Sequence, residues 1–108
     1  MLKSVAAPAA ITIMILIVIS MVALLKLPAG ASIPMQWNLQ GGVNWSAPKA
    51  VGVWFTPAIA LLVLGTFAYA SSQSEAIATR MWPVAYTIGF VLILVHSAHL
   101  WFASKHLG

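Results

Sequence analysis

Two kinds of residue are scarce in this chain of 108: cysteine is absent, and Glu75 is the only acidic residue. Without cysteine there is no disulfide, no thiolate metal site and no cysteine nucleophile. Charged residues make up only 6% of the sequence, whereas a soluble domain carries about a quarter. Because a folded surface so poor in charge would not stay in water, most of the chain requires a bilayer as its solvent.

Long apolar runs take the place of charge. Hydrophobic residues make up 62% of the chain, and its mean hydropathy is +1.01. Three runs, 9–27, 47–70 and 81–103, reach the roughly 20 residues that a helix needs to cross the hydrocarbon. Since a backbone in lipid must satisfy its own hydrogen bonds, each run is predicted to be a helix. We expect one all-α membrane domain over 1–108, with a structured loop rich in Trp, Gly and Pro at 28–46.

The basic residues are scattered singly, near the ends of the apolar runs. They are Lys3, Lys26, Lys49, Arg80 and Lys105. This spacing predicts contacts with anionic lipid head groups, and it excludes the basic patch that nucleic acid binding needs. The expected location is the cell membrane, as a multi-pass protein of a bacterial inner membrane. The charges do not fix an orientation, because the lysines near helix ends can snorkel to the interface.

The segment between the first two runs gathers turn-forming and aromatic residues, IPMQWNLQGGVNWSAPK over 33–49. Asn38 can hydrogen-bond to its own backbone, and the following Gly-Gly pair permits positive φ, so a tight turn is predicted. Two interpretations remain open. The segment is a rigid turn anchored by Trp37 and Trp45, or it is a recognition surface for a protein or peptide. It offers no carboxylate, histidine or cysteine for catalysis.

The same segment resembles the motif of the DUF1648 family, the N-terminal module of SdpI-type immunity proteins. The shared pattern is an Ile-Pro start, an aromatic-Asn pair, a glycine, a second aromatic residue and a basic residue before a hydrophobic helix. The resemblance covers about 9–64, and it departs at Gln36 and Asn44, where the family has His and Asp. The resemblance implies a partner-binding surface, which we expect at Pro34, Gln36, Trp37, Asn38, Gly41, Gly42, Asn44, Trp45 and Lys49.

Small residues recur at helical spacing in the second and third runs. Such faces let neighbouring helices approach closely. The residues expected in helix packing are Gly52, Thr56, Ala60, Ala85 and Gly89. Pro57 lies within the second run and removes one backbone hydrogen bond, so it is expected to bend that helix.

Three histidines share one helical face: His96 and His99 in the third run, and His106 just after it. The main interpretation is hydrogen bonding at the interface or between helices. A metal or tetrapyrrole bound by His96 and His99 is one alternative, and proton-linked sensing is another. The primary expectation is that the chain binds no cofactor.

Three functions follow from these features. The first is a non-enzymatic membrane protein that binds a protein or peptide partner through the loop, and the resemblance implies immunity or sensing, with a secreted peptide as partner. The second is a structural accessory subunit of a larger membrane complex. The third is a metal- or tetrapyrrole-binding protein. The expected partners are the lipid bilayer and either another membrane protein or a second copy of the chain; enzyme activity is not expected.

Overall fold

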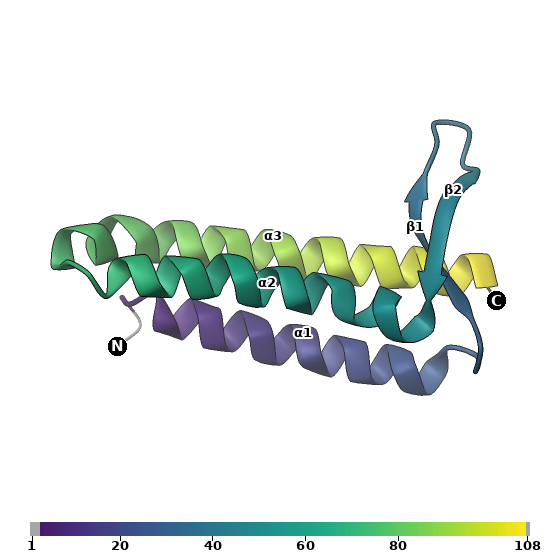
Figure 1. The fold of residues 1–108 in the computed structure, drawn as a ribbon, viewed down its shortest axis with the longest axis horizontal. Coiled ribbons are helices and arrows are strands. Elements are labelled where there is room, and N and C mark those ends of the chain that lie inside the picture. Colours follow the sequence, from purple (N-terminus) through teal and green to yellow (C-terminus); the bar gives the residue numbers. More distant parts are fainter. Residues whose placement is uncertain (1–2, 108) are drawn as a thin grey trace.

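The computed structural model describes residues 3–107, and the side chains of residues 3–105. In chain order its elements are α1 (Ala6–Lys26), β1 (Ser32–Trp37), β2 (Val43–Pro48), α2 (Lys49–Ser71) and α3 (Glu75–Leu107). The three helices lie side by side along the long axis of the molecule (Figure 1). The two strands form a hairpin at one end, beside the C-terminus, and the α2–α3 connection lies at the other end (Figure 1).

The predicted three-helix membrane architecture is confirmed: all three helices are long and apolar enough to cross a membrane. Helices α1 and α2 have 21 and 23 residues, close to the length that a bilayer requires. Helix α3 has 33 residues. At 1.5 Å per residue it is about 50 Å long, which exceeds the roughly 30 Å of hydrocarbon. Its ends therefore extend beyond the apolar layer.

The all-α prediction is wrong between the first two helices, where the segment predicted as a loop, 28–46, contains a β-hairpin. The strands pair antiparallel, with Ser32 opposite Pro48 at the base and Trp37 opposite Val43 near the tip. Backbone polar groups outside a helix still need partners, and pairing two strands across a tight turn supplies them.

A proline and a change of register conceal these strands in the sequence. Pro34 sits inside β1, where it cannot donate to the ladder, and the pairing shifts on either side of Gln36. The two-residue alternation that reveals a strand is therefore broken. The second strand also includes residues 47–48, which were predicted to begin the second helix.

The core has two parts, one along the bundle and one beneath the hairpin. The buried residues of the first are Val5, Ala9, Leu16, Ala60, Leu64 and Ala85. Those of the second are Leu27, Ile33, Val53, Leu100 and Ala103. Ile33 of β1 is fully buried in this second cluster, so the hairpin contributes a side chain to the packing of all three helices.

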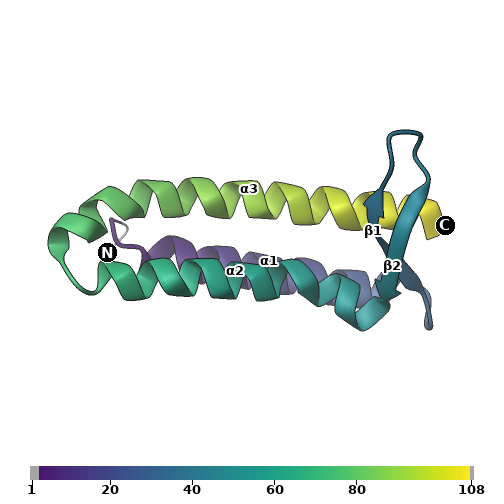
Figure 2. The ribbon, with the colours of Figure 1, turned by 45° about the horizontal axis from the view of Figure 1, so that its top comes forward.

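The hairpin runs across the direction of the helices in both views of the ribbon (Figures 1 and 2). When the helices align with the membrane normal, the hairpin therefore lies parallel to the membrane surface. Along the helix axes, the hairpin lies beside the C-terminal part of α3, where His99 contacts β1.

Candidate functional site

The tip of the hairpin is built by Asn38 and two glycines. The Asn38 Oδ1 accepts hydrogen bonds from the backbone N–H groups of Gln40 at 3.0 Å and Gly42 at 2.8 Å. Gly41 has a φ of +84°, which a side chain would strain. A Cβ at Gly42 would lie 2.9 Å from the Asn38 Nδ2. These three residues of the motif are thus explained by the geometry of the turn.

The base of the hairpin is held against α2 and α3. A Cβ at Gly52 would lie 2.7 Å from the Cβ of Ile33, so this glycine of α2 makes room for β1 and not for another helix. On α3, the His99 Nε2 lies 2.7 Å from the carbonyl oxygen of Pro34. A carbonyl only accepts, so this nitrogen carries the proton. The ring of Trp37 packs edge-on against His99, with centroids 5.9 Å apart.

Lys49 ties the base of the hairpin to the end of α1. Its Nζ donates to the carbonyl oxygens of Leu24 at 3.3 Å and Leu27 at 3.2 Å. The residue four positions after Leu24 is Pro28, which has no N–H, so the Leu24 carbonyl lacks a helical donor. A positive charge also suits the C-terminal end of a helix. The charge of Lys49 is therefore directed to the end of α1, and its side chain is partly buried.

A second polar cluster joins the three helices inside the bundle. Pro57 has no N–H, so the carbonyl of Val53, four residues earlier, also lacks its helical donor. The Ser20 hydroxyl of α1 donates to this carbonyl, and the His96 Nε2 of α3 lies 2.9 Å from the Ser20 Oγ. Because Ser20 has a single hydrogen, His96 is the donor in the second bond. Helix α2 thus continues through Pro57, with a side chain supplying the missing bond.

His96 and His99 of α3 have different partners and therefore different roles in the fold. His96 is fully buried, and its Nδ1 has no hydrogen-bond partner among the described residues. Within the part of the chain that the structure describes, no three His, Cys, Asp or Glu side chains gather as metal ligands do. In this arrangement a metal or tetrapyrrole would reach His96 or His99 only through Nδ1. Ligation stays a prediction, and the side chain of His106 lies outside the described residues.

The other small residues predicted to pack helices occupy three environments. Gly89 of α3 lies directly against Thr12 of α1, whose hydroxyl fills the space that a Cβ would take. Ala60 and Ala85 are fully buried in the core cluster along the bundle. Thr56 is only partly buried, and it lines a hollow beside the hairpin.

The remaining residues of the motif lie on the surface of the hairpin. Gln36 and Asn44 are exposed, Trp45 is 50% exposed, and Leu39 at the tip is completely exposed. Two hollows flank the Trp37 side chain. The first, of about 280 Å³, is lined by Met35, Trp37, Phe55, Thr56, Val95 and His99. The second, of about 320 Å³, is lined by Trp37, Gly41 and Phe102.

Sequence reasoning missed several of these contributors. Ser20 is a polar residue within a strongly apolar run, and that isolation is a signal for a bond between helices. Leu39 lies next to the turn residues, where an apolar side chain has no core to enter. The hollows around Trp37 have no signal in the sequence, because they depend on how the hairpin meets α2 and α3.

The fold defines a small multi-pass membrane protein with a hairpin held at one end of its helices. Residues 11–61 match the family model described as a domain of unknown function, DUF1648. This is the family that the loop motif predicted. The matched segment contains most of α1, the hairpin and the first half of α2, and it leaves α3 outside. Neither the curated proteins nor the solved structures gave a match.

Proposed function

We propose that this protein is a non-enzymatic membrane protein that binds a protein or peptide partner through the outer surface of the hairpin. The observation that carries the proposal is that the residues of the motif fall into two groups, one holding the fold and one exposed. Asn38, Gly41, Gly42 and Lys49 are engaged in the turn and the helix end. The exposed side chains, Leu39 and Trp45 above all, make no comparable contribution to the fold.

The chemistry of this surface suits an extended segment with an apolar anchor. Large aromatic and aliphatic side chains that fill small hollows supply most of the energy in many interfaces. The hollows beside Trp37, of about 280 and 320 Å³, have room for a large apolar side chain, and Gln36 and Asn44 on the same hairpin offer neutral donors and acceptors. In keeping with the resemblance to SdpI-type proteins, the partner would be a secreted peptide, and the function immunity or sensing in the cell membrane of a bacterium.

Native mass spectrometry of the tagged protein, extracted gently from its own membrane, tests the proposal. The expected result is a stoichiometric partner mass that is lost with Leu39→Ser and with Trp45→Ser. Phe90→Ser is the matched control, because Phe90 is an aromatic residue of α3 that is 65% exposed and lines neither hollow beside the hairpin. Partner mass that survives both hairpin substitutions would overturn the proposal.

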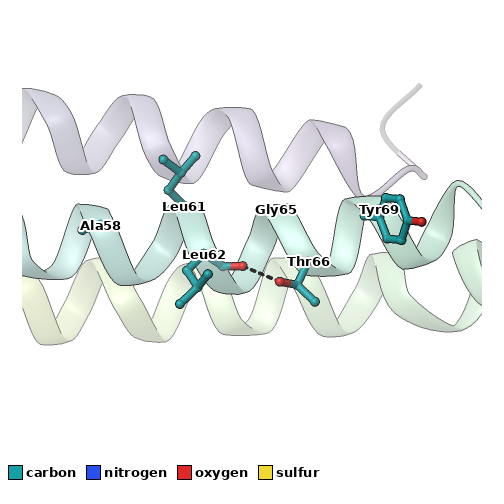
Figure 3. Close-up of a pocket in the computed structure, with 6 residues that line it drawn as sticks. All are labelled: Ala58, Leu61, Leu62, Gly65, Thr66 and Tyr69. Carbon is teal, nitrogen blue, oxygen red and sulfur yellow. Dashed lines mark hydrogen bonds between the residues drawn. The ribbon is translucent and has the colours of Figure 1, made fainter.

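An accessory subunit of a larger complex is a second candidate, favoured by the outer face of α2. Its side chains form an open groove lined by Ala58, Leu61, Leu62, Gly65, Thr66 and Tyr69 (Figure 3). Nothing lies within 4 Å of the position that a Cβ of Gly65 would take, so a partner helix has room to approach. Gly65→Leu should release the partner mass if this candidate is correct, and leave it intact if the hairpin is the binding surface.

A further inference from the structure

A groove of about 300 Å³ separates α1 and α3 at the hairpin end of the bundle. Its lining residues are Ile19, Val22, Ala23, Lys26, Leu27, Leu100, Trp101 and Ser104. We infer that this groove binds an anionic phospholipid, with an acyl chain along its apolar floor and the phosphate at its cationic rim. The inference is independent of the proposed partner binding at the hairpin.

The groove changes from apolar to polar along the helices. Ile19 and Val22 lie one to two turns inside α1, whereas Lys26 is the last residue of that helix. On α3 the same order holds, since Leu100 precedes Ser104 by one turn. The polar end of the groove therefore coincides with the end of α1, which is the level at which a bilayer changes from hydrocarbon to head groups.

Among the side chains that the structure describes, residues 3–105, no acidic group lies near the positive charge at the rim. Lys26 is exposed and lines the groove, and the Lys105 Nζ lies 5.3 Å from the ring centroid of Trp101, which also lines it. The only acidic side chain of the chain, Glu75, is in the first turn of α3, at the opposite end of that helix. Basic pockets between membrane helices bind the head groups of anionic lipids.

The hydroxyl of Ser104 is already used within α3. It donates to the carbonyl oxygen of Trp101 at 2.7 Å, so the charged contacts to a phosphate come from the two lysines. A second copy of the chain, packed in the same orientation, would bring no acid to Lys26 and Lys105, because its Glu75 would lie at the opposite end; unmatched charges of this kind are costly in a membrane. A phospholipid supplies the negative charge and leaves the lysines in the hydrated head-group layer.

The test is lipid binding to the full chain in detergent, measured by native mass spectrometry. Phosphatidylglycerol and phosphatidylcholine with identical acyl chains are the probes. We expect a retained phosphatidylglycerol adduct, weakened roughly fivefold for each cation removed in Lys26→Gln and Lys105→Gln. The charge-preserving pair Lys26→Arg and Lys105→Arg should retain binding. Val22→Trp, which fills the apolar floor, should abolish it.

The control removes the same charge from the opposite end, through Lys3→Gln and Arg80→Gln, and should leave the adduct unchanged. Three results would each overturn the inference. The first is that phosphatidylcholine binds as strongly as phosphatidylglycerol, and the second is that the control pair weakens binding as much as the rim pair does. The third is that a second copy of the chain occupies the groove, seen as a lipid-free dimer that Val22→Trp dissociates.

Discussion

The two connections between the helices differ in how far their contacts reach. In the first connection β1 contacts α2 through Ile33 and α3 through Pro34, and Lys49, directly after β2, reaches back to α1. In the second connection, residues 72–74, the hydrogen bonds join residues no more than four positions apart. The hairpin end of the bundle therefore carries an ordered surface, whereas the connection at the other end only reverses the direction of the chain.

This difference supports the proposal that the function lies at the hairpin end. A connection that only returns the chain to the membrane needs a few residues, as the second connection shows. The first connection orders a hairpin by contacts with α2 and α3, and ordering each residue costs conformational entropy of about 1–2 kcal/mol. Most contacts that hold the hairpin are separate from its exposed side chains, so the proposed partner would meet a surface already in place.

Filling the space at Gly52 should have the largest effect. In Gly52→Val the new side chain would overlap Ile33, and overpacking of this kind costs about 1–3 kcal/mol. The free energy of unfolding, measured in mixed micelles with increasing dodecyl sulfate, should fall by about 2 kcal/mol. Gly65→Val is the matched control on the same helix, where the space is open. Equal losses for the two variants would show that β1 is not held at Gly52.

Removing the Ser20 hydroxyl should have the next largest effect. In Ser20→Ala the Val53 carbonyl freed by Pro57 loses its donor and His96 loses its acceptor, so we expect a loss of about 1–2 kcal/mol in the same unfolding assay. The control is Thr66→Ala, whose exposed hydroxyl bonds only the Leu62 carbonyl of its own helix. A loss as small as that of the control would contradict the three-helix contact.

The helices could be predicted from the sequence, whereas the contacts that fix the hairpin could not. Bilayer thickness and the demand for internal hydrogen bonds leave a long apolar run few alternatives to a helix. The spacing of Gly52, Thr56 and Ala60 identifies a face of small residues but not its neighbours, and for Gly52 the neighbour is a strand. The bond between His99 and Pro34 joins residues 65 positions apart, and it depends on the rotation of α3 and the placement of the hairpin.

Loss of the His99 bond should loosen the hairpin without melting the bundle. His99→Phe keeps a ring beside Trp37 but removes the donor to Pro34, a bond worth about 1 kcal/mol. Amide hydrogen exchange across 31–48 should therefore rise roughly fivefold, with α1 and α2 unchanged. Ser104→Ala on the same helix serves as the control, since its hydroxyl bonds only within α3. Unchanged exchange in His99→Phe would show that the other contacts are sufficient.

The smallest effect should come from the second connection. Ser72→Ala removes an exposed hydroxyl that bonds the Tyr69 carbonyl, and the unfolding free energy should change by less than about 0.5 kcal/mol. Two glycines inserted after Ser72 should be tolerated for the same reason, since loop length has a weak effect on stability. A large loss from either change would remove the contrast between the two ends.

Site-specific photo-crosslinking in the native membrane tests the central claim most directly. A photoreactive amino acid is placed at Leu39 or Trp45 on the hairpin, and in a matched sample at Gln73 in the second connection. Our account predicts one discrete crosslinked partner from the two hairpin positions and none from Gln73. Crosslinks from Gln73 alone, or the same products from both ends, would contradict it.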